Sequence, residues 1–209
     1  MFGDGSLTFR EFAVREPLPL ATIQAAVLEF LEGRDDAAVF GAQAVNAYVD
    51  EPRMTQDVDI LSQRAEELAE ELRAYLAQRF QIAVRTRTAK EGVGYRIYQL
   101  RKPKNRHLVD VWRVAQLPLC NRLREVLVAA PAELISHKVR SLVNRRNTPK
   151  GMTDTADLRR LLLAFPELKS AEGLVADALH AAGAVEEAFD AWHDLVAQEI
   201  QPDDEDTDF

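Results

Sequence analysis

Two aspartates separated by a single residue lie in the apolar stretch MTQDVDIL. If this stretch forms a strand, Asp57 and Asp59 point to the same face of the sheet, because side chains alternate along a strand. Aspartate is poorly suited to strand interiors, and neighbouring carboxylates repel each other. A bound cation removes this repulsion, so the pattern predicts a metal site at Asp57 and Asp59.

A third acid occurs in a similar setting. In HLVDVWRV, Asp110 lies inside an apolar run, on the same side of the predicted strand as Leu108 and Trp112. If this strand pairs beside the one with Asp57 and Asp59, three carboxylates meet at one point. Such oxygen ligands suit Mg²⁺ or Mn²⁺, and a pair of these ions can promote displacement at phosphorus. The alternative is that each acid lies on an exposed strand face or pairs with an arginine.

A possible phosphate site precedes these acids. The segment FGAQAVNAYV passes from a strand into a helix at Gly41 with almost no loop. Backbone N–H groups at a helix start have no partner within the helix, so those near Gly41 and Ala42 can bind an anion. The alternative is that Gly41 serves only as a tight-turn residue.

The elements that position these residues follow from the spacing of apolar side chains. Helices are predicted at 19–33, 41–51, 64–80, 131–146, 154–165, 170–183 and 184–200. Strands are predicted at 36–41, 56–61, 80–88, 94–101, 107–114 and 124–129. This order predicts an α+β fold in which a mixed sheet is flanked by helices and followed by a helical lobe.

The predicted domain boundary lies near Pro118, where the pattern changes from strands to helices. It divides the chain into an α/β lobe at 1–117, a C-terminal helical lobe at 118–201 and an acidic, disordered tail at 202–209.

Charge is distributed unevenly along the chain, which has a net charge of −8. Residues 79–150 contain 17 Lys and Arg against 4 Asp and Glu, so this segment is strongly basic and the remainder strongly acidic. The overall charge argues against a general nucleic-acid-binding protein. The basic segment can nevertheless hold RNA if its side chains converge on a site; otherwise it is simply solvated surface.

Composition also limits the class of protein. The single cysteine, Cys120, rules out an intrachain disulfide framework, and no apolar run approaches the length of a membrane span. The N-terminal residues lack the pattern of a secretory signal, so we expect a cytoplasmic protein. The four histidines are scattered along the chain, and we do not expect them to form a metal cluster: His107, His137, His180 and His193.

The motifs together resemble the nucleotidyltransferase superfamily that includes DNA polymerase beta. In that superfamily a glycine opens a helix, an Asp-x-Asp follows in an apolar strand, and a third acid lies on a later strand. The matching segments are Phe40-Gly41-Ala42, Asp57-Val58-Asp59 and Asp110.

Within the superfamily, the chain is most similar to the AbiEii/AbiGii-type toxin nucleotidyltransferases. Their Arg-x-Ser/Thr-x-Asp-x-Asp pattern is matched by Arg53, Thr55, Asp57 and Asp59. The similarity continues in VLVAAPAELISHKVRSLVNRRNTPKGMTDTADLRRLL. The matching positions there are Lys138, Arg145, Arg146, Lys150, Asp154 and Asp157.

The resemblance implies transfer of a nucleoside monophosphate from a nucleoside triphosphate to an acceptor hydroxyl. Asp57, Asp59 and Asp110 would bind Mg²⁺ or Mn²⁺, and Asp110 would help to deprotonate the hydroxyl. The nucleotide would be bound by Gly41, Ala42, Arg53, Thr55, Lys138 and Arg145. The acceptor would be RNA, such as tRNA, or a protein, and the partner could be the antitoxin of a toxin–antitoxin pair.

Simpler roles remain open for two of these positions. Lys138 could be a solvated helix lysine, and Asp154 could only favour the N-terminus of the helix that follows it.

Three other functions also remain open. Ala42 stands where the family usually has Gly or Ser, which removes a hydroxyl contact to phosphate and favours a protein that binds nucleotide or nucleic acid without turnover. The chain could instead be an interaction module of a toxin–antitoxin pair. The same chemistry could also act on a small molecule such as an antibiotic.

Overall fold

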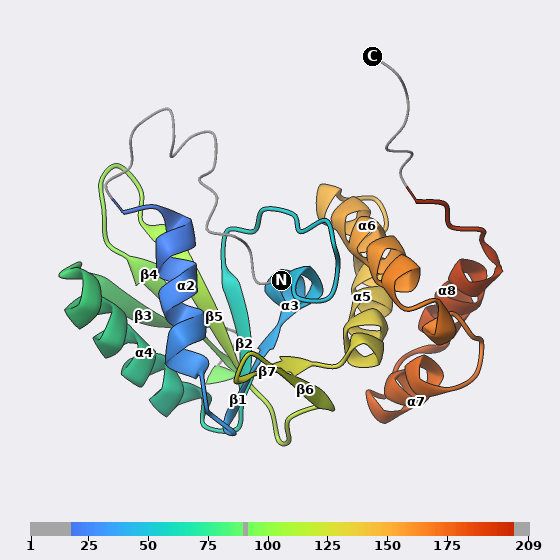
Figure 1. Cartoon of the computed structure of the whole chain (residues 1–209), viewed down its shortest axis with the longest axis horizontal. Coiled ribbons are helices and arrows are strands. Elements are labelled where there is room, and N and C mark those ends of the chain that lie inside the picture. The colour runs from blue at the N-terminus through green and yellow to red at the C-terminus, as the bar shows by residue number, and fades with distance from the viewer. Residues whose placement is uncertain (1–17, 90–91, 203–209) are drawn as a thin grey trace, which may run out of the picture. The chain divides into compact units, whose positions relative to one another are not determined.

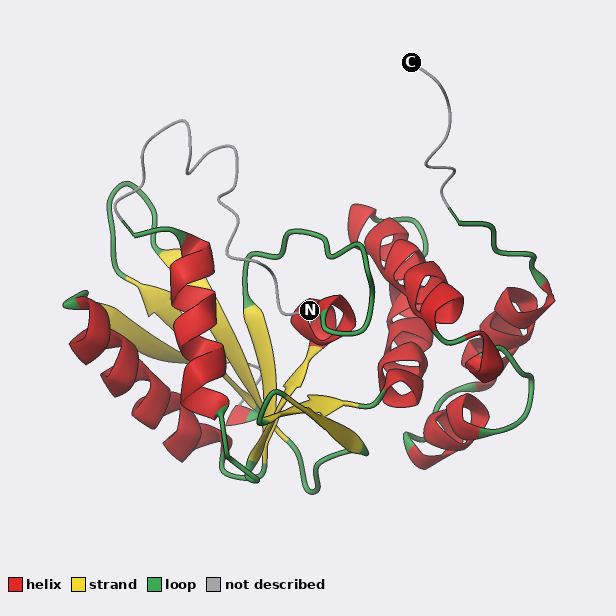
Figure 2. Cartoon of the chain, in the orientation of Figure 1, coloured by secondary structure: helices red, strands yellow, loops and turns green. Residues whose placement is uncertain are grey.

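The structure, a computed structural model, describes residues 18–89 and 92–202. It divides into two compact units: residues 1–47 with 51–130, and residues 48–50 with 131–209. The first unit contains the sheet and the second contains the C-terminal helices (Figures 1 and 2). The α+β fold predicted from the sequence is confirmed.

A mixed seven-stranded sheet in the order β3-β4-β5-β2-β1-β7-β6 forms the first unit. The β1–β7 and β2–β5 pairs are parallel, and the other neighbours are antiparallel. The strands are β1 (Ala37–Phe40), β2 (Val58–Ser62), β3 (Val84–Ala89), β4 (Gly94–Gln99), β5 (Arg106–Arg113), β6 (Cys120–Leu123) and β7 (Val126–Ala129).

In the part of the first unit that the structure describes, three helices accompany the sheet: α2 (Leu20–Leu31), α3 (Gly41–Asn46) and α4 (Ala65–Phe80). Helix α4 packs on β2, β3, β4 and β5, and α2 packs on α4, β5 and β7. The fully buried Leu68, Leu72 and Leu76 lie one turn apart along α4 and form its core stripe. Asp59 and Asp110 therefore lie on the opposite face of β2 and β5, which α4 does not cover.

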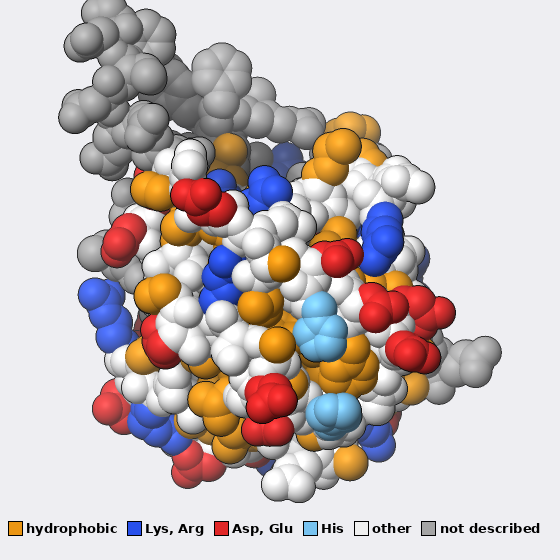
Figure 3. Space-filling view, turned by 90° about the vertical axis from the view of Figure 1, so that its right-hand side faces the viewer, with side chains coloured by type: hydrophobic (Ala, Val, Ile, Leu, Met, Phe, Trp, Pro, Cys, Tyr) orange, Lys and Arg blue, Asp and Glu red, His pale blue; other side chains and the backbone are white. Residues whose placement is uncertain are grey.

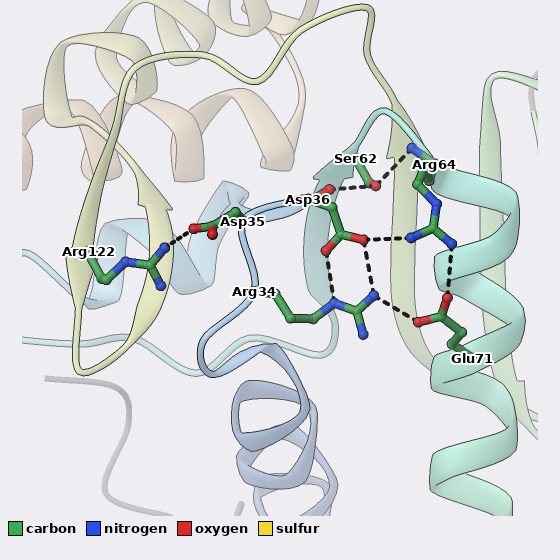
Figure 4. Close-up of polar contacts among 7 residues, drawn as sticks. All are labelled: Arg34, Asp35, Asp36, Ser62, Arg64, Glu71 and Arg122. Atoms are coloured by element: carbon green, nitrogen blue, oxygen red, sulfur yellow. Dashed lines mark hydrogen bonds and ion pairs between the residues drawn. The ribbon is translucent and has the colours of Figure 1, made fainter.

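A network of alternating charges joins the start of β1 to the end of β2 and to α4 (Figure 4). Arg34 pairs with Asp36 at 2.9 Å and with Glu71 at 2.8 Å. Arg64 pairs with the same two acids at 3.1 and 3.2 Å. The Ser62 hydroxyl donates to the carbonyl of Asp36 at 2.7 Å, so the Ala37–Ser62 end of the β1–β2 pair is fixed.

The second unit is built around α5 (Pro131–Arg145), which packs against α6 (Pro149–Ala164), α7 (Leu174–Ala181) and α8 (Glu186–Ala197). A short 3₁₀ helix, η2 (Pro166–Leu168), follows α6. Trp192 is fully buried in this unit, and its indole N–H donates to the carbonyl of Ser170 at 3.1 Å. Within the described residues, no helix combines the length and apolar character needed to cross a bilayer.

The division between the units differs from the boundary expected near Pro118. It falls between Ala130 and Pro131, because β6 and β7 form a hairpin that continues the sheet through the β1–β7 pair. The predicted strand at 124–129 corresponds to β7, whereas β6 was not predicted. Most of the tail expected at 202–209 lies outside the described residues.

Three element boundaries also differ. Helix α3 ends at Asn46 rather than continuing toward Pro52, because Asn46 forms two hydrogen bonds with the backbone of Arg53 that close the following loop. Strand β2 begins at Val58, so Asp57 immediately precedes the strand. Helix α6 begins at Pro149, where Thr148 caps it, so Asp154 lies inside the helix and not at its start.

Candidate active site

Two of the three predicted acids are direct neighbours in the sheet. The parallel pairing of β2 with β5 places Asp59 opposite Asp110, and both point away from α4 by strand alternation. Apolar residues flank them on the helix-covered face, where Val58, Ile60 and Val109 are fully buried. The predicted pairing of these two strands is confirmed.

His107 links the third acid to this pair. Its Nδ1 lies 3.2 Å from the carboxylate of Asp57, and its Nε2 lies 3.0 Å from that of Asp110. Burial disfavours the imidazolium ion, but the hydrogen bonds to Asp110 and Asp57 outweigh this effect and raise the pKa of His107 to about 9. The sequence did not indicate that His107, alone among the four histidines expected to form no metal cluster, lies in a group of described residues that could hold a metal ion.

Asp110 is the most buried acid of the cluster, with 7% of its side chain exposed. Arg96, opposite it on β4, places Nε 3.0 Å from the Asp110 carboxylate. The charge of Asp110 raises the pKa of Arg96 further. Asp110 thus lies between two cationic groups, Arg96 and the His107 imidazolium.

Asp59 has a different environment. Trp112 donates its indole N–H to the Asp59 carboxylate at 3.2 Å, and the Trp112 ring lies against Gly94, where a Cβ would come within 2.5 Å of it. The other Asp59 oxygen lies beside Gly41, where a Cβ would come within 2.2 Å. Gly41 also has φ +65°, a conformation that glycine adopts without strain. Gly41 is therefore required both by the turn and by the Asp59 carboxylate.

The upstream residues expected to bind nucleotide lie in α3 and in the loop between α3 and β2. Ala42 is half-buried in the first turn of α3. The Thr55 hydroxyl donates to the carbonyl of Asp57 at 2.9 Å and so helps to hold the loop before β2. Arg53 is bound through its backbone to Asn46, and its guanidinium donates to the carbonyl of Met54 at 3.3 Å.

Lys138 belongs to the second unit, in a buried ion cluster between α5 and α6. Its amine lies 2.8 Å from Asp154 and 2.6 Å from Asp157, and only 8% of the lysine side chain is exposed. Arg145 approaches Asp154 at 3.6 Å, and Arg160 approaches Asp157 at 3.9 Å. These contacts correct two alternatives drawn from the sequence: Lys138 is not a solvated lysine, and Asp154 does not serve the start of α6.

The acid cluster has ligands that fit a divalent cation. One ligand atom each from Asp57, His107 and Asp110 lies within 4.8 Å of the others. Carboxylate oxygens suit Mg²⁺ and Mn²⁺, whereas a neutral imidazole nitrogen suits metals such as Zn²⁺ and Fe²⁺. This set differs from the predicted set, because it contains His107 and leaves Asp59 bound to Trp112.

His107, Arg96, Trp112 and Gly94 are the residues of this site that the sequence did not reveal. Strand alternation shows which residues share a face of one strand, but not which residues face each other across strands. The register of β4 on β5 also shifts between Ile97 and Tyr98, which brings His107 opposite Tyr98. Only the paired sheet shows these contacts.

The same fold occurs in nucleotidyltransferase structures. The Megavirus polyadenylate synthase matches with a TM-score of 0.59 and 13% identity, over 75% of this chain and 34% of that chain. JHP933 from Helicobacter pylori matches with a TM-score of 0.56 and 14% identity, over 91% and 90%. ANT(2″)-Ia in complex with adenylyl-2″-tobramycin matches with a TM-score of 0.51 and 14% identity, over 85% and 100%.

This chain therefore spans about a third of the viral enzyme but nearly the whole length of the other two proteins. No curated protein sequence matches it significantly. The fold is thus one that nucleotidyltransferases have.

The family model "Nucleotidyl transferase AbiEii toxin, Type IV TA system" matches residues 25–207. The chain belongs to this family, as its motifs predicted.

Proposed function

We propose that this protein transfers a nucleoside monophosphate from a nucleoside triphosphate to a hydroxyl of RNA, such as tRNA, or of a protein. The observation that supports this proposal is the pairing of Asp59 with Asp110 on adjacent strands, with Asp57 joined to Asp110 through His107. Among the described residues, Asp59 and Asp110 thus lie on the face of the sheet that α4 does not cover, next to Asp57 and to Gly41 at the start of α3.

Asp57, Asp59 and Asp110 would hold Mg²⁺ or Mn²⁺, and the His107 imidazolium would orient the carboxylates of Asp57 and Asp110. When bound, such ions stabilise the charge that develops on the attacking and leaving oxygens. The acceptor oxygen attacks the α-phosphorus, a new phosphorus–oxygen bond forms, and pyrophosphate leaves. Asp110 accepts the hydroxyl proton, directly or through water.

The backbone of Gly41 and Ala42 would contact the phosphates, and Arg53 and Thr55 would line the nucleotide site. Thr55 acts through the backbone of Asp57, which it holds in place. Lys138 and Arg145 are the candidate phosphate contacts of the second unit. Both side chains already pair with Asp154, so a phosphate would have to compete with this carboxylate for them.

The family description supports a role as the toxin of a type IV toxin–antitoxin pair. We propose that it acts in the cytoplasm and that its partner is an antitoxin protein. A second candidate function follows from Ala42, which has no hydroxyl to offer a phosphate: the protein would bind nucleotide or nucleic acid with little turnover. A third is transfer to a small molecule, because ANT(2″)-Ia, a structure of similar fold, contains an adenylylated tobramycin.

One labelling experiment separates these functions. The protein is incubated with each α-labelled triphosphate, with Mg²⁺ or Mn²⁺, and with total cell RNA, total cell protein or an aminoglycoside. Metal-dependent label in RNA or protein supports the proposal and identifies the acceptor. Label only in the aminoglycoside supports the third candidate. Nucleotide binding without label under any condition supports the second.

A further inference from the structure

Two arginines continue the row of site residues across the sheet. The registers place Asp59 opposite Asp110, Asp110 opposite Arg96, and Arg96 opposite Arg87 on β3. Strands in a sheet lie about 4.8 Å apart, so Arg87 is about 10 Å from Asp110 across β4. Arg85, two residues earlier on β3, shares its face with Arg87. The acids therefore continue into a basic strip on the same face.

This basic strip, defined as Arg85, Arg87 and Tyr98, lies on the face of β3 and β4 opposite α4. Tyr95 and Glu66 show which face α4 covers, because their side chains bond at 3.0 Å. The guanidinium of Arg87 lies 5.9 Å from the centre of the Tyr98 ring, which confirms that Arg87 and Tyr98 share the other face.

The arginines of the strip are available to a ligand. Arg85 and Arg87 are exposed. Among the ion pairs between described residues, neither arginine has an acidic partner. Tyr98 is half-buried, and its ring stacks 5.1 Å from that of His107, so the strip reaches the acid cluster without a break. Two arginines without an acidic partner among the described residues, together with an aromatic ring, thus lie on one side of the proposed reacting centre.

The order of the strands indicates which substrate would lie there. Gly41 and the start of α3 lie on the β1 side of Asp59, where the phosphates of the triphosphate are proposed to bind. The strip lies on the opposite side, beyond Asp110, which is the proposed acceptor of the hydroxyl proton. A hydroxyl that attacks from the Asp110 side brings its own molecule over β4 and β3.

We propose that the basic strip binds the single-stranded 3′ end of an RNA acceptor and directs its terminal hydroxyl toward Asp110. Arg85 and Arg87 contact phosphates, and Tyr98 supplies a face for an unpaired base. Aromatic and arginine side chains on a sheet are a general means of holding single strands, because every base has a face that can stack. This inference rests on the proposed function for the position of the reacting phosphorus.

Direct RNA binding tests the inference without any need for turnover. A fluorescein-labelled single-stranded RNA of about ten nucleotides is titrated with the full chain, without nucleotide, at several salt concentrations, by fluorescence anisotropy. We expect Arg85→Gln/Arg87→Gln to weaken binding about tenfold at low salt, and to reduce the slope of log K against log salt by about 1.4. Tyr98→Ala should weaken binding about fivefold or more with little change in slope.

The matched control removes two arginines from the other side of the sheet. Arg73→Gln/Arg79→Gln makes the same change in net charge on α4 and should bind RNA nearly as wild type does. Thermal unfolding of each variant shows whether it is folded. The inference would be overturned if Arg85→Gln/Arg87→Gln bound RNA as tightly as the wild type does, or if the control variant lost as much RNA affinity as this variant. Equally tight binding of a duplex of the same sequence would also overturn it, because paired bases cannot stack on Tyr98.

Failure of the proposed function gives a different result. Nucleotide binding with Mn²⁺, measured by calorimetry, should be unchanged in Arg85→Gln/Arg87→Gln. If the wild type transfers no nucleotide but its RNA binding depends on the strip, the inference stands and the proposed function does not. If transfer to protein is observed and RNA binding does not depend on the strip, the proposed function stands and the inference does not.

Discussion

At the scale of single residues, the geometry of the site depends on Gly41. Its φ of +65° disfavours any side chain, and an added Cβ would lie 2.2 Å from the Asp59 carboxylate, at the end of β1 that pairs with Asp59. The Asp59 side chain therefore has little freedom to move, because it lies between Gly41 and Trp112.

Gly41→Ala is expected to lower the free energy of unfolding by about 2–4 kcal/mol and to displace Asp59, because strain and close contact add. Urea denaturation measures the first effect, and nucleotide transfer measures the second. Gly33→Ala is the matched control: Gly33 has φ +71° but nothing within 4 Å of an added Cβ, so only about 1 kcal/mol of strain is expected. Equal losses in the two variants would show that the contact with Asp59 has no effect.

At the scale of elements, α5 and α6 are held together by ions and not only by apolar packing. Lys138 forms ion pairs with two acids, one of which, Asp157, is fully buried. Burying such a cluster is costly, but removing one partner is costlier still, because the remaining charges are left without compensation.

Lys138→Met should therefore destabilise the protein by about 3–5 kcal/mol, measured by chemical denaturation. Lys150→Met, at an exposed position in α6, should change stability by no more than about 0.5 kcal/mol. A stable Lys138→Met variant that has lost only nucleotide binding would contradict the structural role of Lys138 and favour its role as a phosphate contact.

His137, the neighbour of Lys138 in α5, makes stability depend on pH. Burial, helped by the positive charges of Lys138 and Arg140, lowers the pKa of His137 to about 4. Because the folded pKa lies below the unfolded value of 6.5, the unfolded state binds more protons in acid. The stability that depends on neutral His137 is fully present above pH 6.5 and is lost as the pH falls toward 4.

Between pH 6.5 and 5 the wild type should therefore lose about 1–2 kcal/mol more stability than His137→Gln, which does not titrate. Denaturant titrations of both proteins across this range measure the difference. Parallel stability profiles would show that His137 titrates normally in the folded protein.

At the scale of the whole molecule, the sequence predicted what depends on local patterns. Apolar spacing predicted the main helices, and alternation predicted that Asp59 and Asp110 lie on strands whose acids could meet. What depends on strand register was not predicted: Arg96 meets Asp110 through the pairing of β4 with β5, and His107 meets Asp57 because β2 pairs with β5. Strand β6 was missed because it is not deeply buried and so carries no apolar alternation.

Surface charge also differs between parts of the molecule. On the face seen in Figure 3, acidic and basic side chains are interspersed with hydrophobic ones, and neither charge dominates. The basic strip of β3 and β4, in contrast, has two exposed arginines side by side. An overall charge of −8 is thus compatible with a local site for RNA, because the site is set by a few residues and not by the sum.

The most direct test of nucleotide transfer at the acid cluster is the initial rate of label transfer from an α-labelled triphosphate, with Mg²⁺ or Mn²⁺, to the acceptor found in the labelling experiment. Asp59→Asn and Asp110→Asn, each nearly the same size as the wild-type residue, should lower this rate at least about a hundredfold while the protein stays folded. Gln198→Asn, in the C-cap of α8, should transfer at the wild-type rate. Unchanged transfer by folded Asp59→Asn and Asp110→Asn proteins would contradict the assignment of the active site.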